Sequence, residues 1–302
     1  MSLSHFRFGA SLYALLSITF WGVSFVSTKA VLDKMDPFSL LVVRFGIGAM
    51  FLFGLVVLFR YPLKIKLAYV PHLLVLGILG VFVHQVVQAS ALLTIQASDA
   101  GWLISLSPIF TVLLSLIFLQ EKLSLGKVIG VSIAVAGVLL ITTVGHGQSF
   151  GFSLSIGYFL MIASTLNWAV YSVLLKKLAI PMPSLVVTFY MSMIGFIMTL
   201  PFFVRNDGLN QLATLESEHW AHLLFLGIFV SAVAYWYWAK ALEVMQASQV
   251  SVFMYFEPLA TLVAAIILLN ERFMASSLLG GCLIILGVML VQERFRPGKT
   301  FK

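Results

Sequence analysis

The sequence predicts an all-α membrane protein with ten transmembrane helices, arranged as two inverted five-helix repeats around a central cavity. Three observations support this prediction: an apolar composition, a succession of apolar stretches long enough to cross a bilayer, and an internal repeat. Of the 302 residues, 61% are hydrophobic and 10% are charged, whereas soluble domains average roughly 45–50% and 25%. The chain is therefore too apolar for the core of a water-soluble protein.

Nearly the whole chain divides into apolar stretches separated by short polar breaks. A membrane-spanning helix needs roughly 20 predominantly apolar residues. The stretches do not alternate between apolar and polar residues as the strands of a membrane barrel do. The expected spans cover residues 10–32, 38–59, 70–92, 97–119, 126–144, 153–175, 184–204, 220–242, 247–269 and 276–292.

The first span is expected to be retained in the mature protein. Arg7 precedes an apolar stretch that begins at Phe8, as in a signal peptide. However, the stretch continues beyond Val26, which is longer than a signal h-region, and no small-residue cleavage site follows it.

The basic residues indicate the orientation in the membrane. With the N-terminus inside, thirteen Lys and Arg residues fall on the inner side and four (Lys29, Lys34, Arg205 and Arg272) on the outer side, with Arg44 inside a span. The positive-inside rule then places both termini in the cytoplasm of a bacterium, with the chain in the inner membrane. Although the net charge is +7, the basic residues form no concentrated patch, so no nucleic-acid partner is expected. The single cysteine, Cys282, excludes an intramolecular disulfide and is expected to be buried.

The chain contains an internal repeat. A shift of 150 residues aligns 73–140 with 223–290 without a gap, and 21 of the 68 aligned positions are identical, too many for chance. The repeat units are expected at 1–147 and 148–302. Because each unit contains five helices, an odd number, the second must enter the membrane from the opposite side. Inverted repeats are typical of secondary transporters, whose substrate site lies near the bilayer midplane between the repeats.

Two prolines occupy equivalent places in the two halves. Pro108 and Pro258 stand at the middle of the fourth and ninth expected spans, each after a Gln-Ala-Ser sequence. Proline inside a helix frees a backbone carbonyl and kinks the helix, which lipid tolerates only where neighbouring groups or a cavity satisfy that carbonyl. The pair indicates either a binding site at the interrupted helices or a kink that serves packing.

Several spans carry polar and aromatic side chains where lipid alone would favour leucine or valine. Gln85 and Gln88 share one helix face, and their repeat mates are Tyr235 and Trp238. A glutamine amide facing lipid is costly, so these side chains are expected to face inward. Aromatic walls with a few polar groups suit an amphipathic solute, although Trp and Tyr also form belts at membrane surfaces. The expected substrate-binding residues are Trp21, Gln85, Gln88, Trp102, Asn167, Trp168, Tyr171, Tyr235, Trp238 and Tyr255.

Ionisable residues within spans are the candidates for ion coupling. Glu257 lies one residue from the centre of the ninth span, where charged groups are usually functional. It is expected to take up a proton or a substrate ammonium group, or else to serve helix packing; its repeat mate is Ser107. His84 is a candidate proton relay, or a hydrogen-bonded structural histidine.

Four further charged residues are expected to have structural roles. Lys29 and Arg44 lie near the outer ends of their spans, where Arg44 is expected to bond free carbonyls of a neighbouring helix end. Glu121 and Glu271 end the fourth and ninth spans and are expected to interact with the N-terminal amides of the next helix.

The order and duplication of several motifs resemble a known family. These are Trp21-Gly22 followed by Lys29, Arg44-Phe45, the repeated Ala-Leu, Gln-Ala-Ser, Pro and Glu blocks, and Phe256-Glu257-Pro258 ahead of Glu271. Over essentially its whole length the chain resembles EamA-type members of the drug/metabolite transporter superfamily. The resemblance implies a ten-helix fold with a cavity lined by helices 1, 3, 4, 6, 8 and 9, and export of amino acids or other small metabolites.

The sequence contains no catalytic serine motif, zinc-protease motif, phosphate loop or Cys/His metal cluster. It therefore predicts no enzyme, no metal and no cofactor. The predicted function is secondary transport of a small aromatic or amphipathic metabolite by alternating access, with the lipid bilayer as surroundings and protons as a candidate coupling ion. Alternatives are a passive facilitator or an importer, and a multi-pass membrane enzyme or sensor. Both a monomer and a homodimer fit the sequence.

Overall fold

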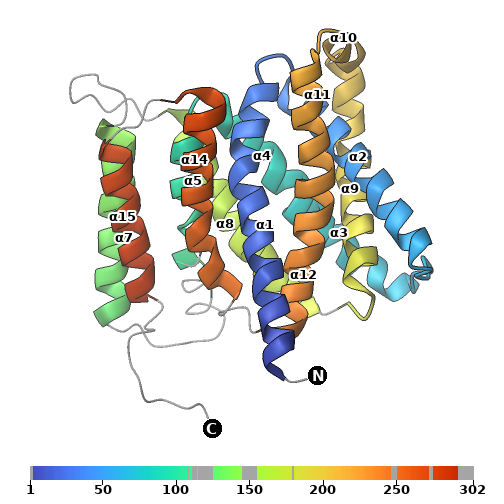
Figure 1. Cartoon of the computed structure of the whole chain (residues 1–302), viewed down its shortest axis with the longest axis horizontal. Coiled ribbons are helices and arrows are strands. Elements are labelled where there is room, and N and C mark those ends of the chain that lie inside the picture. The colour runs from blue at the N-terminus through green and yellow to red at the C-terminus, as the bar shows by residue number, and fades with distance from the viewer. Residues whose placement is uncertain are drawn as a thin grey trace.

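The described part of the chain consists of helices (Figure 1). A computed structural model describes residues 3–107, 109–110, 114, 125–144, 155–178, 180–245, 250–271 and 275–291. The first half contains α1 (Leu3–Val31), α2 (Pro37–Leu58), η1 (Leu67–Tyr69), α3 (Val70–Gly77), η2 (Ile78–Val83), α4 (His84–Leu92), α5 (Ala97–Ile104) and α7 (Leu125–Val144). The second half contains α8 (Ile156–Leu178), α9 (Ser184–Arg205), α10 (Gly208–Ala213), α11 (Ser217–Leu224), η3 (Phe225–Ala234), α12 (Tyr235–Val244), η4 (Ser251–Phe256), α14 (Glu257–Leu269) and α15 (Ala275–Val291).

Six helical segments among the described residues are long and apolar enough to cross a membrane. They are Phe8–Val31, Pro37–Leu58, Leu67–Leu92, Ile156–Leu175, Ser184–Arg205 and Ser217–Val244. Shorter apolar helices cover Val128–Ile141, Phe253–Leu269 and Ala275–Gly287. These segments fall within a few residues of expected spans, and the fourth expected span is described only in part. The all-helical, multi-pass fold is thus confirmed, while the number of ten spans stays a prediction.

Helix α1 lies in the middle of the bundle and packs against helices of both halves. Its neighbours include α5 of the first half and α11, α12 and α14 of the second. Figure 1 shows α1 between α14 on one side and the α11–α12 segment on the other. The α7 and α15 helices pack against each other at one end of the bundle (Figure 1). Cys282 on α15 is exposed, so the expected burial of this side chain was wrong.

Gly22 lets α1 approach α14 closely. A Cβ atom at this position would lie 2.7 Å from both the Glu257 carbonyl oxygen and the Ala260 Cβ atom. Ordinary contacts of a Cβ atom are longer, and the Glu257 carbonyl belongs to the helix backbone, so one of the two helices would have to move. This close approach sets the distance between α1 and the first turn of α14.

Gly22→Ala is expected to lower the thermal stability of the purified protein, because the added methyl group pushes α1 and α14 apart. Overpacking of this kind costs about 1–3 kcal/mol. Gly54→Ala is the matched control, since a Cβ atom added at Gly54 of α2 would have no heavy atom within 4 Å. Equal melting temperatures for the two variants would contradict the assigned contact.

The third and eighth spans are each interrupted by π-helical turns at repeat-related positions. These turns are η2 and η3, and neither was expected from the sequence. Side chains from other helices bond the carbonyls there: Asn167 Nδ2 donates to Leu79 O at 2.7 Å, and Ser17 Oγ donates to Ala234 O at 2.9 Å. Such π-helical turns are frequent at functional sites.

The ninth span changes its helical form just before Pro258. The 3₁₀ segment η4 passes into α14, and Pro258 stands in the first turn of α14. Proline at this position removes no intrahelical hydrogen bond, so it marks a helix start. The expected interruption is therefore present, although Pro258 does not kink a continuous helix. Pro108 lies outside the described residues.

Asp36 joins the α1–α2 connection to the α9–α10 connection of the other half. Its Oδ1 accepts from the Ser39 amide at 3.3 Å and from Asn206 Nδ2 at 3.0 Å, and its Oδ2 accepts from Gln211 Nε2 at 3.0 Å. Partial burial raises the pKa of Asp36, but the hydrogen bonds from Ser39, Asn206 and Gln211 outweigh it, so the pKa lies below its ordinary value. The charged carboxylate therefore stabilises this end of the bundle.

Acidification is expected to weaken this contribution. Because the folded-state pKa of Asp36 is depressed, its stabilisation is complete above the ordinary aspartate pKa of about 3.9 and is lost as the pH falls through the lower native value. Asp36→Asn should lower the melting temperature at pH 7 and flatten its decline below about pH 4. Asp33→Asn, which changes an exposed carboxylate in the same connection, is the control. Identical pH profiles for the two variants would remove the assigned role.

Candidate functional site

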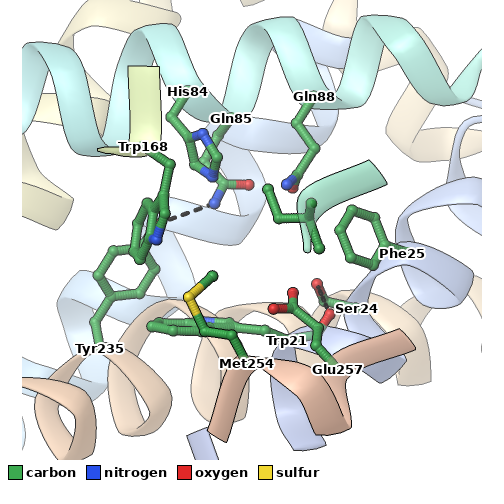
Figure 2. A pocket seen from close by; sticks show the side chains of 11 residues that line it. Trp21, Ser24, Phe25, His84, Gln85, Gln88, Trp168, Tyr235, Met254 and Glu257 are labelled. Atoms are coloured by element: carbon green, nitrogen blue, oxygen red, sulfur yellow. Dashed lines mark hydrogen bonds between the residues drawn. The ribbon is translucent and has the colours of Figure 1, made fainter. Parts of the chain in front are cut away.

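A small cavity lies in the interior of the bundle, among α1, α4, α5, α8, α12, η4 and α14 (Figure 2). The space open to the centre of a water molecule is about 20 Å³, little more than one water needs. Ligand pockets usually measure roughly 300–1,000 Å³, so this cavity is too small to hold a metabolite. The lining residues are Trp21, Ser24, Phe25, His84, Gln85, Gln88, Ile104, Trp168, Tyr235, Met254 and Glu257.

Aromatic rings form one wall of the cavity. Trp21 of α1 is the centre of this wall, with ring centroids 5.2 Å from Trp168 and 5.4 Å from Tyr235. Trp238, which does not line the cavity, packs on Trp21 with centroids 5.2 Å apart. These distances are typical of aromatic pairs that stabilise one another. The wall therefore joins α1 of the first half to α8 and α12 of the second.

A chain of hydrogen bonds runs behind the cavity from Arg44 to Tyr235. Arg44 Nε donates to Ser231 Oγ at 2.7 Å, and Arg44 Nη1 donates to Gln85 Oε1 at 2.9 Å. Gln85 Nε2 then donates to the Tyr235 hydroxyl at 3.0 Å (Figure 2), and that hydroxyl donates to Gly80 O at 3.2 Å. Because a guanidinium group has only donors, the Gln85 amide oxygen must face Arg44 and its NH₂ group must face Tyr235.

Arg44 is buried deeply for a charged residue. Its exposed fraction is 1%, and Nη2 has no hydrogen-bond partner among the described residues. It bonds side chains of α4 and η3 rather than free carbonyls at a helix end, which corrects the sequence-based expectation. Lys29 instead bonds such a carbonyl, because its Nζ donates to Ile95 O at 2.5 Å.

Glu257 lies on the side of the cavity opposite to Gln85. Figure 2 shows His84, Gln85 and Gln88 along one side and Trp21, Met254 and Glu257 along the other. Glu257 is 3% exposed, and its Oε2 atom has no hydrogen-bond partner among the described residues. The Trp21 Nε1 donor is likewise buried without a partner there. The cavity therefore presents polar atoms that the described part of the protein does not satisfy.

His84 is held against α8. Its Nδ1 atom lies 2.8 Å from Ser164 Oγ and 3.1 Å from Ser164 O, and Ser164 Oγ also donates to His84 O at 3.1 Å. Its ring packs on Trp168 with centroids 5.0 Å apart. This geometry favours the hydrogen-bonded histidine of the two sequence-based alternatives, and the proton relay stays a prediction.

The cavity lining includes five of the ten expected substrate-binding residues together with Glu257 and His84. Trp102 packs against Gly281 of α15, and Asn167 bonds the carbonyl of Leu79. Tyr171 packs against Gly80, and Trp238 packs on Trp21. Tyr255 is half-buried and packs against the hydrophobic cluster that contains Trp102. The five expected residues outside the cavity lining are Trp102, Asn167, Tyr171, Trp238 and Tyr255.

Several lining residues were missed by the sequence analysis. Ser24 follows Trp21 by one helical turn, and Met254 precedes Glu257 by the same spacing, so the i, i+3 relation to a selected residue was the available signal. Phe25 and Ile104 carry no such signal, because apolar side chains are equally expected on lipid-facing surfaces. Arg44 was assigned a structural role, although it orients the amide of Gln85.

Glu271, which follows α14, contacts the start of α5. Its Oε1 accepts from the Ala97 amide at 3.0 Å, and its Oε2 accepts from the Ser98 amide at 3.3 Å and from Ser98 Oγ at 2.9 Å. Lys29 Nζ lies 3.7 Å from Oε1. The carboxylate thus caps α5, a helix of the other half. Glu121 lies outside the described residues.

These features define a class of protein: a multi-pass helical membrane protein with a small polar and aromatic cavity inside its bundle. The model of the EamA-like transporter family matches residues 9–143 and 155–292. The chain belongs to the EamA-like transporter family, so the protein is a transporter of that family.

Relatives with assigned names cover nearly the whole chain. An uncharacterized transporter of Archaeoglobus fulgidus is 32% identical over 92% of this chain and 97% of that protein. A protein of Escherichia coli named a probable amino-acid metabolite efflux pump is 26% identical over 96% of each chain. A probable terminal-alkyne amino-acid exporter of Streptantibioticus cattleyicolor is 25% identical over 93% of this chain and 92% of that protein. A solved crystal structure shares the fold, with a TM-score of 0.67, 21% identity, and coverage of 96% of this chain and 99% of that chain.

Proposed function

We propose that the protein is a secondary exporter of amino acids or related small aromatic or amphipathic metabolites across the bacterial inner membrane, working by alternating access. The observation that carries the proposal is the small central cavity, in which buried polar groups and aromatic rings surround a space too small for a metabolite. A solute can enter only if the bundle opens, and a transporter opens to one side at a time. The names of the two relatives that refer to amino-acid export support this choice of solute.

The proposal includes two inverted five-helix units, residues 1–147 and 148–302. Contacts between repeat mates support it. Gln85 bonds Tyr235, which stands 150 positions later, and a residue can touch its own repeat mate only near an axis that relates the halves. In the α7–α15 pair, Gly137 meets Gly280, and the equivalent Gly287 meets Gly130. The two family-model matches divide the chain in the same way.

The proposed topology has both termini in the cytoplasm. It follows from the thirteen-to-four distribution of basic residues. In this orientation the Lys29–Glu271 contact lies on the periplasmic side. Labelling of single cysteines in intact cells tests the orientation: modification of a C-terminal cysteine by an impermeant reagent from the periplasmic side would overturn it.

Purified protein in proteoliposomes tests the function. Vesicles loaded with an unlabelled amino acid should accumulate the labelled amino acid by counterflow, and an imposed pH gradient should change that accumulation. A passive facilitator would equilibrate the solute without responding to the gradient, and an importer would be driven in the opposite direction. Chemical conversion of the solute without movement would favour a membrane enzyme and overturn the proposal.

Gln88→Leu and Trp238→Leu are each expected to weaken transport without preventing membrane insertion. Both positions are 6–8% exposed inside the bundle, and the changes make the helices more lipid-compatible while removing a polar group or an aromatic contact with Trp21. The loss of one such contact, about 1 kcal/mol, should raise the apparent KM about fivefold. Leu93→Ala, on an exposed side chain after α4, is the control. Wild-type kinetics in both variants would reassign these residues to packing.

A further inference from the structure

Basic and aromatic side chains gather at the end of the bundle where α2 and α12 end. This aromatic–basic surface is formed by Phe59, Arg60, Lys64, Lys66, Trp236 and Lys240. We propose that it binds the headgroup of an anionic phospholipid. In the proposed orientation the surface faces the cytoplasmic leaflet. The binding is separate from the proposed transport function and does not depend on which solute is carried.

Lys240 lies against two aromatic rings. Its Nζ atom is 4.5 Å from the ring centroid of Trp236 and 5.5 Å from that of Tyr13, which is within the range of cation–π interactions. Among the described residues no carboxylate lies within 4.0 Å of Nζ, although the exposed Glu243 stands one turn further along α12. The rings therefore hold the ammonium group in place without neutralising its charge.

Phe59 joins Lys240 to a second group of cations. The Phe59 ring packs on Trp236 with centroids 6.3 Å apart, and Arg60 follows directly in the turn that ends α2. Arg60 is exposed and has a φ of 56°, a left-handed position at which glycine is usual. The backbone therefore gives no reason for an arginine here, whereas an anion bound at this surface does.

Lys64 and Lys66 point away from the bundle. The alternate residues Leu63 and Ile65 pack against the apolar interior, and the Tyr190 hydroxyl donates to the Leu63 carbonyl. Both lysines are exposed, so burial and exposure alternate along these four residues as in an extended segment. The connection after α2 is thus fixed by its apolar side chains and presents both charges outward.

An anionic phospholipid matches both the charges and the apolar side chains of this surface. The four cations have no carboxylate within 4.0 Å among the described residues, and a phosphate group accepts charge-assisted hydrogen bonds from several donors. Aromatic rings settle at the level of lipid headgroups, and basic residues there attract anionic lipids. Leu58 and Leu67, at the two ends of the connection, are 71% and 85% exposed. A soluble anion would leave these leucines uncovered, whereas acyl chains cover them.

Thermal shift of the purified full-length protein in a neutral detergent tests the proposal. Phosphatidylglycerol should raise the melting temperature by at least about 2 °C more than phosphatidylcholine with the same acyl chains, because a ligand of the folded state stabilises it. Glycerol 3-phosphate at the same concentration, which has the anionic group without acyl chains, should have no such effect. Equal stabilisation by the two lipids, or by phosphatidylglycerol and glycerol 3-phosphate, would overturn the proposal.

Two variants test the contact between Lys240 and its ring. Lys240→Gln and Trp236→Leu should each weaken the binding of phosphatidylglycerol about fivefold, as measured by titration of the thermal shift, because a charge or the ring that holds it is lost. Lys177→Gln is the matched control, since Lys177 is an exposed lysine of α8 without a cation–π contact in the described part of the chain. Wild-type titrations for both variants, or an equal loss in the control, would contradict the assigned site.

Arg60→Gly separates lipid binding from folding. Glycine is favoured in left-handed backbone, so this variant should melt at about the wild-type temperature in phosphatidylcholine. Its additional stabilisation by phosphatidylglycerol should be smaller than that of the wild type, because one cation of the surface is lost. A purely structural arginine predicts the opposite pattern, with a lower melting temperature in both lipids and an unchanged difference between them, and that result would overturn the role of Arg60 in lipid binding.

Discussion

Glu257→Gln is expected to leave a weakened exchange activity that no longer responds to a pH gradient. The carboxyl group is buried, its Oε2 atom has no partner among the described residues, and it lines the cavity. A proton and a solute ammonium group would then compete for the same carboxylate, which is how binding of one can drive release of the other. Glutamine keeps the shape but neither titrates nor carries charge. If Glu257 also binds a solute ammonium group, the loss of that contact should weaken solute affinity about tenfold or more.

The measurement compares counterflow at equal internal and external pH with uptake driven by an imposed pH gradient. Wild-type protein should respond to the gradient, and the variant should give the same rate with and without it. Glu243→Gln, which removes a charge from an exposed residue of α12, is the control. If Glu257 only supports helix packing, the variant will lower the folded yield or slow all modes alike. A variant that the gradient still drives normally would exclude Glu257 as the coupling acid.

The positions of the spans were predictable because apolar length decides them. The expected span 38–59 corresponds to Pro37–Leu58, and 184–204 corresponds to Ser184–Arg205. Inward-facing glutamines were also predictable, since lipid exposure of an amide is costly. Gln85 and Gln88 accordingly lie in the cavity lining. In these cases the free energy of contact with lipid outweighs all other contributions.

Whether an aromatic side chain faces the cavity or packs against another helix was not predictable in the same way. Helices in a bilayer are apolar all round, so periodicity does not mark an inner face as it does in a soluble protein. Trp102 and Trp168 looked equivalent in the sequence, yet Trp168 lines the cavity and Trp102 packs against α15. Aromatic side chains are tolerated in both places, and the choice depends on the packing of distant helices.

Long-range partners were the other failure of the sequence analysis. Glu271 was expected to cap the next helix, and a nearby partner is the only one that a sequence suggests. The carboxylate caps α5, more than 170 positions away in the chain, and residues 272–274 at the start of the next helix lie outside the described residues. The Arg44–Gln85–Tyr235 chain has the same origin, because its members come from α2, α4 and α12 and meet only in the folded bundle. The π-helical turns η2 and η3 likewise depend on side chains supplied by neighbouring helices.

In the proposed orientation, the Lys29–Glu271 contact is expected to hold the periplasmic side of the bundle closed, and Glu271→Gln should open it. The carboxylate accepts three hydrogen bonds at the start of α5 and lies 3.7 Å from Lys29 Nζ. An amide has one acceptor oxygen, and its NH₂ group would face donors at the helix N-terminus. Hydrogen bonds to charged groups contribute about 1.5–3 kcal/mol each, so the loss of one should shift the equilibrium toward the open form about tenfold or more.

Alkylation of a cysteine in the cavity reports this opening. Ser24→Cys would be introduced together with Cys282→Ser, because Ser24 lines the cavity and Cys282 is the exposed native thiol. An impermeant reagent added on the periplasmic side should react about tenfold faster when Glu271→Gln is also present, because the closed form protects the thiol. Glu243→Gln in the same background should leave the rate unchanged. If Glu271→Gln and Glu243→Gln gave the same alkylation rate, the contact would have no role in closure. The same conclusion would follow if Glu271→Gln accelerated the reaction only from the cytoplasmic side, because α5 and α14 would then remain joined without Glu271.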